Sequence, residues 1–177
     1  MENYLLLCRN CHGKIDKVPE EFPVETLRAW RESHITWVDE ELQASLTRVT
    51  FAELESVTDA IASAASLATS DFQLTPPDAK MDRNGLTQRL RRVIALSLSQ
   101  AGQVRDFLME FEETAPDFPE KLIGGFRKRY YEARARGLTG DDLYNHLATH
   151  ESSDLALQTA QGMVVAYLFH TCDLFES

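Results

Sequence analysis

Apolar residues recur every three to four positions over most of the chain, which is the spacing of one face of a helix. The longest stripe runs from Leu86 to Phe111 and predicts a helix of about seven turns. A second stripe repeats every four residues and predicts a helix that ends at Gly137; it comprises Phe118, Leu122, Phe126 and Tyr130. The pattern therefore predicts a mainly α fold, built as an antiparallel helical bundle.

The closing segment is apolar on most of its predicted helical surface, so we expect it to form the centre of the bundle. Ser152 or Ser153 is its expected cap, and the helix is expected to run to about Phe175. Within it, His170 is predicted to be a buried, hydrogen-bonded histidine and Cys172 a small buried hydrophobe. Before it, Thr139 is the expected cap of a short helix through Leu147, with Asp142 three positions later.

Changes in composition and helix-start signals divide the chain into three predicted segments. These are an N-terminal segment at 1–36, a helical connector at 37–70 and a helical domain at 71–177. In the connector, Thr50 is the expected cap of a helix that starts at Phe51. An Ala-, Ser- and Thr-rich stretch then ends in Thr75-Pro76-Pro77-Asp78, which is typical of a helix start.

The first segment has a different pattern. Tyr4–Leu7 suits a short strand, and the Cys8-x-x-Cys11-His12 sequence that follows suits a tight turn. Pro23 then precedes a predicted helix over Val24–Ile35. We therefore expect a strand, a zinc knuckle and a helix, a truncated ββα-metal remnant that is too small to hold a core of its own.

Composition and charge exclude several classes of protein. The chain has 177 residues, 18 basic and 28 acidic, for a net charge of −10, which excludes a broadly basic nucleic-acid coat. Three cysteines do not make a disulfide scaffold, so a reducing cytoplasm is the expected location. The start lacks a basic leader, and the uncharged stretch Leu155–Cys172 carries too many polar groups for a membrane span. We expect no membrane association.

Two thiolates at the spacing of Cys8 and Cys11 can share one Zn²⁺, but two ligands do not close a tetrahedral site. His12, His34 or residues of a partner would have to complete it. Two alternatives stay open. The cysteines are free and reduced, or Cys-x-x-Cys-His attaches a c-type haem, which would require export.

A basic, aromatic stretch lies in the second predicted helix of the domain. Arg127, Arg129 and Tyr130 are its candidate binding residues, for phosphates or for an acidic protein. Residues 37–177 hold 13 basic and 22 acidic residues, which favours a protein partner over nucleic acid. A DNA-binding regulator that uses this helix is the alternative. Asp142, His146 and His150, spaced by four, are a further candidate metal face or a solvated helix end.

Residues 3–34 resemble the second half of an HNH endonuclease domain. Asn3 and His12 match the motif's Asn and last His; the other matches are Cys8 and Cys11 between them, Lys14-Ile15-Asp16, the FPVETLRAW helix and His34. The resemblance implies that His12 ligates a catalytic divalent metal ion and that Asn3 braces the loop with the general base. Metal would then stabilise the charge that develops on the scissile phosphate.

The family's first His, its general base, and its upstream zinc-binding cysteines would lie before Met1. The resemblance therefore implies an incomplete nuclease site, with weakly held structural zinc, and we expect little or no cleavage by this chain. The alternative is an active, metal-dependent HNH endonuclease that cleaves DNA when a longer natural chain or a partner supplies the base.

Residues 71–177 resemble the C-terminal domain of ABC-three-component system effectors. The matching pieces are Lys80, Asn84-Gly85-Leu86, Tyr130 with Gly137-Leu138, and the closing Tyr167-Leu168-Phe169, Cys172-Asp173 and Phe175-Glu176. The resemblance implies a docking component of a prokaryotic defence system against phages and other invading DNA. Its expected partners are the middle component and the ATPase of that system.

Overall fold

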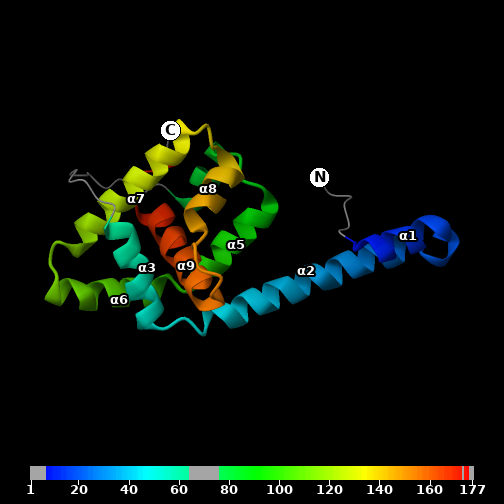
Figure 1. Cartoon of the computed structure of the whole chain (residues 1–177), viewed down its shortest axis with the longest axis horizontal. Helices are drawn as coiled ribbons and strands as arrows, with labels where there is room; N and C mark the ends of the chain where they lie inside the picture. The colour runs from blue at the N-terminus through cyan, green and yellow to red at the C-terminus, as the bar shows by residue number, and fades with distance from the viewer. Residues whose placement is uncertain (1–6, 64–75, 173, 176–177) are drawn as a thin grey trace. The chain divides into compact units, whose positions relative to one another are not determined.

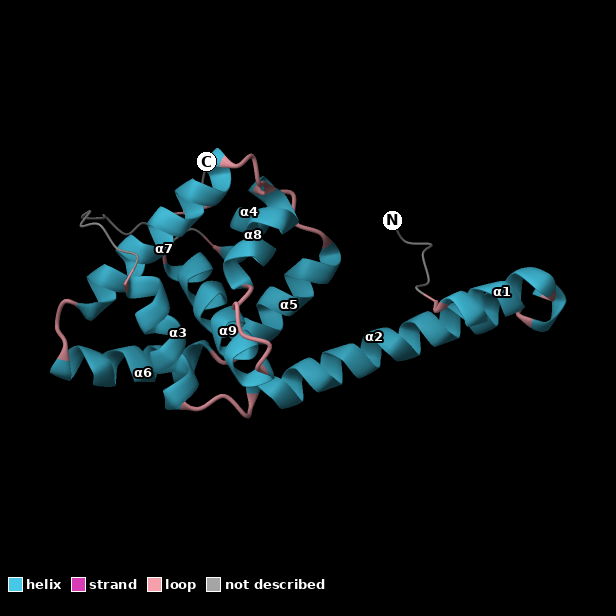
Figure 2. Ribbon diagram, viewed as in Figure 1, coloured by secondary structure: helices cyan, strands magenta, loops and turns pink. Residues whose placement is uncertain are grey.

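The computed structural model describes residues 7–63, 76–172 and 174–175, and these residues form helices and loops with no strand among them (Figure 2). The prediction of a mainly α fold is therefore confirmed. The chain divides into two compact units, residues 1–42 and 43–177, which are described separately.

The first unit contains helix α1 (Arg9–Lys17), a 3-10 turn (Pro19–Glu21) and most of helix α2 (Val24–Leu46). The expected knuckle turn is wrong, because the segment from Arg9 forms a helix with Cys8 as its N-cap. Most of the expected strand lies outside the described residues, and Leu7, which is described, is not part of a strand. Helix α2 continues well past the expected end at Ile35, since no Gly or Pro interrupts it before Leu46.

The second unit is a bundle of helices (Figure 1). Its elements are α3 (Phe51–Ala62), α4 (Pro77–Arg83), α5 (Gln88–Leu98), α6 (Ala101–Thr114), α7 (Phe118–Ala135), α8 (Gly140–Ala148) and α9 (Leu155–Thr171). Helix α4 begins at the Pro-Pro-Asp sequence, as predicted, with a proline in its first turn where the missing N–H costs nothing.

Helix α9 forms the centre of this bundle, as its all-round apolar pattern predicted (Figure 1). It packs against α3, α5, α6 and α8, and Ala160, Val164 and Phe169 are completely buried. Its cap is Asp154, not the expected serines, and it ends at Thr171, short of Phe175. Within the described residues, no helix combines the length and the apolarity that a membrane crossing requires.

Helix α3 begins with the predicted cap. The Thr50 backbone N–H donates to the Glu53 carboxylate at 2.8 Å, and the Thr50 hydroxyl donates to the same carboxylate. This helix lies in the segment predicted as a connector, and it packs against α6, α7 and α9 within the second unit. Its buried residues, including Leu54 and Val57, therefore belong to the core of the bundle.

The single long helix expected from Leu86 to Phe111 is wrong, because the chain forms two helices, α5 and α6. The break falls at Ser99 and Gln100, where the Ser99 hydroxyl donates to the Leu96 carbonyl at 2.6 Å and competes with the helical backbone. The apolar stripe spans the break because both helices pack against α9.

Helices α3 and α7 approach closely at Gly125, and this contact yields a testable prediction. A Cβ atom at Gly125 would lie 1.8 Å from the Ile61 carbonyl oxygen, which is backbone and cannot rotate away. We expect Gly125→Ala to separate the two helices and lower the free energy of unfolding by about 3 kcal/mol or more. Chemical denaturation measures the change.

The matched control is Gly102→Ala in α6, where an added Cβ meets nothing within 4 Å. There the helix propensity of alanine should leave stability unchanged or raise it by up to about 1 kcal/mol. Equal effects of the two substitutions would show that the α3–α7 contact is not as close as the structure has it.

Candidate functional site

The cysteines of the first unit lie close together at the start of α1. Cys8 and Cys11 are free, exposed thiols, three residues apart. Hydrogen bonds from the Cys11 backbone and thiol lower the pKa of Cys8, whereas the shared hydrogen bond with Cys8 raises the pKa of Cys11. The lower pKa favours the Cys8 thiolate, the form that binds a soft metal ion.

The two histidines of the candidate metal set have other partners. His12 Nδ1 lies 2.8 Å from the Asp16 carboxylate, one helical turn on, and the His34 ring stacks on Trp37 with centroids 5.7 Å apart. In residues 7–63, 76–172 and 174–175, no three His, Cys, Asp or Glu side chains are gathered for a metal ion. Asn3 lies outside the described residues. The zinc and HNH ligand sets stay predictions.

Several of the described residues that carried the ABC-three-component resemblance meet at the C-terminal end of α9. Lys80, from α4, is completely buried, and its ammonium donates to the Phe169 carbonyl at 3.0 Å and to the Cys172 carbonyl. A cation there stabilises the carbonyls at the negative end of the helix, where the helical backbone supplies no further N–H donors. We call this contact, with the two that Asn84 makes, the C-terminal clasp.

The Asn84 side-chain amide completes the C-terminal clasp. It donates to the Lys80 carbonyl at 2.8 Å and to the Phe175 carbonyl at 2.7 Å. Phe175 has a φ of 69°, which is unusual for a residue with a side chain. Its ring packs against Tyr130 and Phe169, with centroids 4.9 and 4.8 Å apart. The clasp therefore positions Phe175 against the core and has a structural role.

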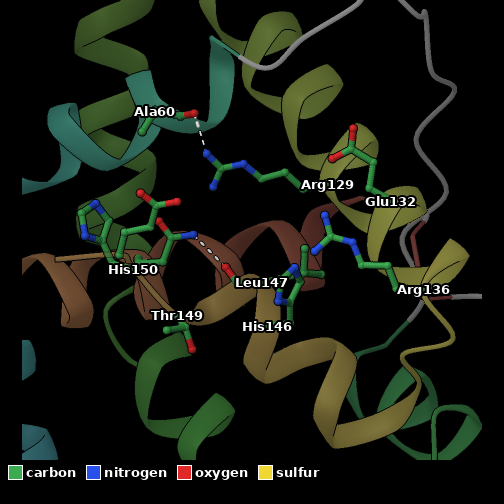
Figure 3. Close-up of a pocket in the computed structure, with 10 residues that line it drawn as sticks. Ala60, Arg129, Glu132, Arg136, His146, Leu147, Thr149 and His150 are labelled. Carbon is green, nitrogen blue, oxygen red and sulfur yellow. Dashed lines mark hydrogen bonds between the residues drawn. The ribbon is translucent and has the colours of Figure 1, made fainter. Parts of the chain in front are cut away.

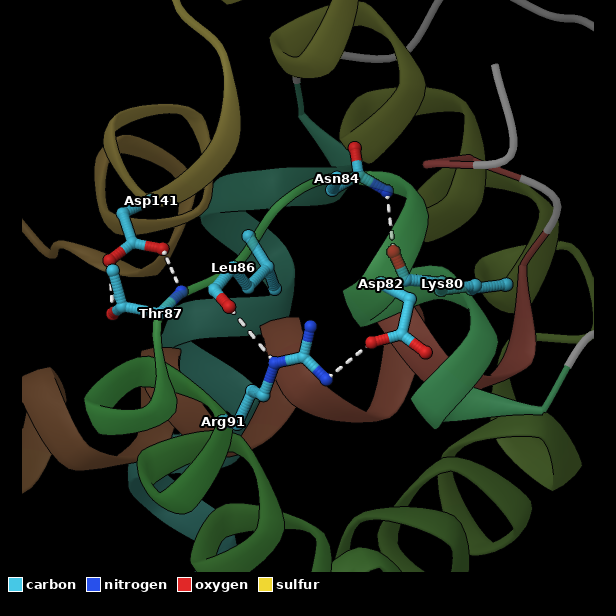
Figure 4. A network of polar contacts seen from close by, with 7 residues as sticks. All are labelled: Lys80, Asp82, Asn84, Leu86, Thr87, Arg91 and Asp141. Atoms are coloured by element: carbon cyan, nitrogen blue, oxygen red, sulfur yellow. Dashed lines mark hydrogen bonds and ion pairs between the residues drawn. The ribbon is translucent and has the colours of Figure 1, made fainter.

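A polar network near the clasp joins α4, α5 and the start of α8 (Figure 4). The Asp141 carboxylate, at the start of α8, accepts from the Thr87 backbone N–H at 2.9 Å and from the Thr87 hydroxyl at 2.5 Å. Arg91 donates to Asp82 at 2.6 Å and to the Leu86 carbonyl at 2.9 Å. The expected Thr139 cap makes no side-chain hydrogen bond. Instead, Asp141 at the start of α8 holds Thr87, the N-cap residue of α5, through these two hydrogen bonds.

Helix α7 buries its aromatic stripe, as predicted: Phe118, Leu122, Phe126 and Tyr130 are all in the core. Tyr130, a candidate binding residue, therefore packs against Phe175 and does not reach the surface. Arg127 and Arg129 are partly exposed, and Tyr131 is exposed. The basic face of α7 thus keeps its arginines at the surface while its tyrosine at position 130 belongs to the core.

Arg129 lines a cleft of about 520 Å³ (Figure 3). The spacing of apolar residues in the sequence did not predict this cleft. Its guanidinium extends from α7 toward α3 and donates to the Ala60 carbonyl at 2.6 Å. Partial burial lowers the pKa of Arg129, and Glu151 and Glu132 oppose that shift. We call this the Arg129 cleft; its ionisable lining is Arg129, Arg136, Glu132, Glu151, His146 and His150.

The histidines of the predicted metal face lie in the Arg129 cleft. His146 is in the last turn of α8, whereas His150 follows the end of that helix, and its Nδ1 accepts from the Ser152 N–H at 3.0 Å. Asp142 does not line the cleft. Gln161 also lines the cleft, and its side-chain amide donates to the Leu147 carbonyl at 2.8 Å. The sequence signals for this cleft were the basic character of α7 and the two histidines spaced by four.

The remaining candidates lie at the end of α9. Cys172 is buried in the core, as predicted. His170 is partly buried, but its Nδ1 is enclosed without a hydrogen-bond partner among the described residues. The expected hydrogen bond at that atom is therefore absent from this part of the structure.

The comparisons with known proteins identify the second unit. No curated protein and no solved structure matches the chain significantly. A family model described as C-terminal domain 10 (CTD10) of the ABC-three component (ABC-3C) systems matches residues 52–176. The match begins in α3 and ends just after the C-terminal clasp, so it covers the bundle and omits the segment that resembles an HNH domain. The chain therefore belongs to the CTD10 family of the ABC-three component systems.

Proposed function

We propose that this chain is a docking component of an ABC-three component system, and that its Arg129 cleft receives acidic side chains of a sister component. As a member of such a system, the chain has the other components as partners. The observation that supports the proposal most is the cleft itself, because it places two arginines and two imidazoles in one recess of an acidic chain.

The cleft has the chemistry to bind a carboxylate. Arg129 uses one donor on the Ala60 carbonyl, and a guanidinium has further N–H groups for a bidentate contact. Arg136 caps the end of α7 and is exposed beside it. An arginine in a partly enclosed recess binds a carboxylate more strongly than one in open solvent, since water screens the pair less.

The charge around the cleft favours a protein over nucleic acid. Glu132 and Glu151 line the same recess and both act on Arg129 electrostatically, so a continuous polyphosphate would meet negative charge beside Arg129. A protein partner presents separate carboxylates and can place neutral or basic groups against these glutamates. This arrangement supports specificity for one protein surface.

The middle component and the ATPase are the proposed partners, and the proposed setting is defence against phages and other invading DNA. The HNH resemblance of residues 1–36 belongs to this proposal as an incomplete nuclease half-site. His12 and Asn3 would be its catalytic residues, with Zn²⁺ and a divalent ion as the metals, if a longer natural chain or a partner supplied the general base.

We expect Arg136→Glu to raise the Kd for the sister component by about tenfold or more, because it replaces an attractive charge with a repulsive one. Isothermal titration calorimetry with each purified sister component measures the effect. Added salt should weaken the wild-type complex, since it screens charges at a partly exposed contact.

The matched control is Arg134→Glu. Arg134 is exposed on the same helix and makes the same charge change, but it does not line the cleft. If both substitutions weaken binding equally, only overall charge matters and the cleft is not the docking site. If neither does, the partner binds elsewhere.

A further inference from the structure

Two thiols meet at the start of helix α1. Cys8 is the N-cap residue, with an extended backbone at φ −64° and ψ 158°, and Cys11 is the third residue of the helix. The side chains at these two positions lie next to each other at a helix start, as they do in a capping box. The Cys8 and Cys11 thiols share a hydrogen bond, so their sulfurs are already neighbours.

Both thiols are open to reagents in solution. Cys8 and Cys11 are exposed, whereas Cys172 is buried in the core of the second unit. A disulfide between Cys8 and Cys11 would close a very short loop, so it would constrain the unfolded chain little. An exposed disulfide of this kind is readily reduced again. The pair is therefore suited to reversible exchange and not to a structural cross-link.

The position of Cys8 makes it the attacking thiol. A sulfur at the N-terminal end of a helix lies near backbone N–H groups and the positive end of the helix dipole, and both favour a thiolate. In the shared hydrogen bond, Cys11 keeps its proton and donates it to the Cys8 sulfur. Cys8 is thus the nucleophile, and Cys11 is the resolving thiol beside it.

We propose that Cys8 and Cys11 form a redox-active dithiol that exchanges with low-molecular-weight disulfides. The Cys8 thiolate attacks one sulfur of the small disulfide, which forms a mixed disulfide and releases one thiolate. Cys11 then loses its proton and attacks the Cys8 sulfur, which closes the Cys8–Cys11 disulfide and releases the second thiolate. The protein gives up two electrons, the small disulfide accepts them, and the protons of the two cysteines end on the two released thiols.

The exchange has a consequence for the first unit. A Cys8–Cys11 disulfide removes both thiolates that the proposed zinc site would use, so oxidation and Zn²⁺ binding at this pair exclude each other. The inference goes beyond the docking function and does not use the Arg129 cleft.

Incubation of the full chain with oxidised glutathione at neutral pH, followed by acid quenching and mass spectrometry, tests the dithiol. We expect the wild type to lose the mass of two hydrogen atoms as Cys8 and Cys11 join. Cys11→Ser should stop at the mixed disulfide on Cys8, because it lacks the resolving thiol. Cys8→Ser should react about tenfold more slowly, since the remaining thiol is not at the N-cap.

The matched control is the double substitution Cys8→Ser with Cys11→Ser, which leaves only the buried Cys172 and should not react. A wild type that accumulates the mixed disulfide without closing the bond would overturn the pairing of the two thiols. Equal rates for the two single variants would overturn the assignment of Cys8 as the nucleophile. Exchange that occurs only after a chelator removes bound metal would also overturn the proposal, because the thiols would then serve the metal.

Discussion

Val164→Asp should abolish soluble folding of the chain. Val164 is completely buried in the middle of α9, and α9 packs against four other helices of the bundle. An aspartate there would be an unpaired charge in the core, at a cost of about 3–5 kcal/mol or more. That cost is comparable with the whole stability of a domain of this size, about 5–15 kcal/mol. The soluble fraction after expression and the thermal melt by circular dichroism measure it.

Leu155→Asp is the control on the same helix. Leu155 is exposed in the first turn of α9, where an acidic residue is favoured by the helix dipole. We therefore expect normal yield and an unchanged or slightly higher melting temperature. A soluble Val164→Asp protein with the wild-type melting temperature would show that α9 lies at the edge of the bundle.

Lys80→Met should destabilise the bundle and loosen its C-terminal end. The substitution keeps most of the apolar stem but removes the ammonium that donates to the Phe169 and Cys172 carbonyls. It relieves the cost of burying a charge, but it takes the donor from two carbonyls at the buried end of α9. Since hydrogen bonds to charged groups are worth about 1.5–3 kcal/mol each, we expect a net loss of about 2 kcal/mol.

Chemical denaturation measures that loss, and hydrogen exchange of the amides near the end of α9 shows where it occurs. Arg89→Met is the matched control, because Arg89 is exposed on α5 and a long cation is again replaced by methionine. Faster exchange at the end of α9 in Lys80→Met only would support the clasp. Equal stability of wild type and Lys80→Met would mean that the buried ammonium contributes nothing net.

Local patterns in the sequence were enough to predict the buried face of one helix and the cap of another. The four-residue repeat from Phe118 to Tyr130 predicted which face of α7 is buried, because apolar side chains on one face leave water only when that face packs against the core. The Thr50–Glu53 cap was predictable because both groups lie within one turn. Some of the residues that carried the family resemblance of the C-terminal part, including Lys80, Asn84 and Phe175, lie together in the C-terminal clasp.

Other predictions failed where a short segment of the sequence allows two structures and does not select between them. Asp154 caps α9 although Ser152 and Ser153 are also good caps, and only the final path of the chain selects among them. The break at Ser99 and Gln100 leaves the apolar repeat intact, so periodicity could not reveal it. The helix at Arg9–Lys17 replaced an expected turn because no residue there forbids either structure.

The amino-acid sequence by itself determined the helical class, the buried faces and the central position of α9, since these depend on spacing between near neighbours. Only the tertiary structure decided the sites. Lys80 lies 89 positions before Phe169, and Arg129 lies 69 positions after Ala60. Contacts over such distances depend on how helices pack, which no local pattern specifies. The packing of the helices also decides that Tyr130 lies in the core while Arg129, its neighbour in sequence, lines the cleft.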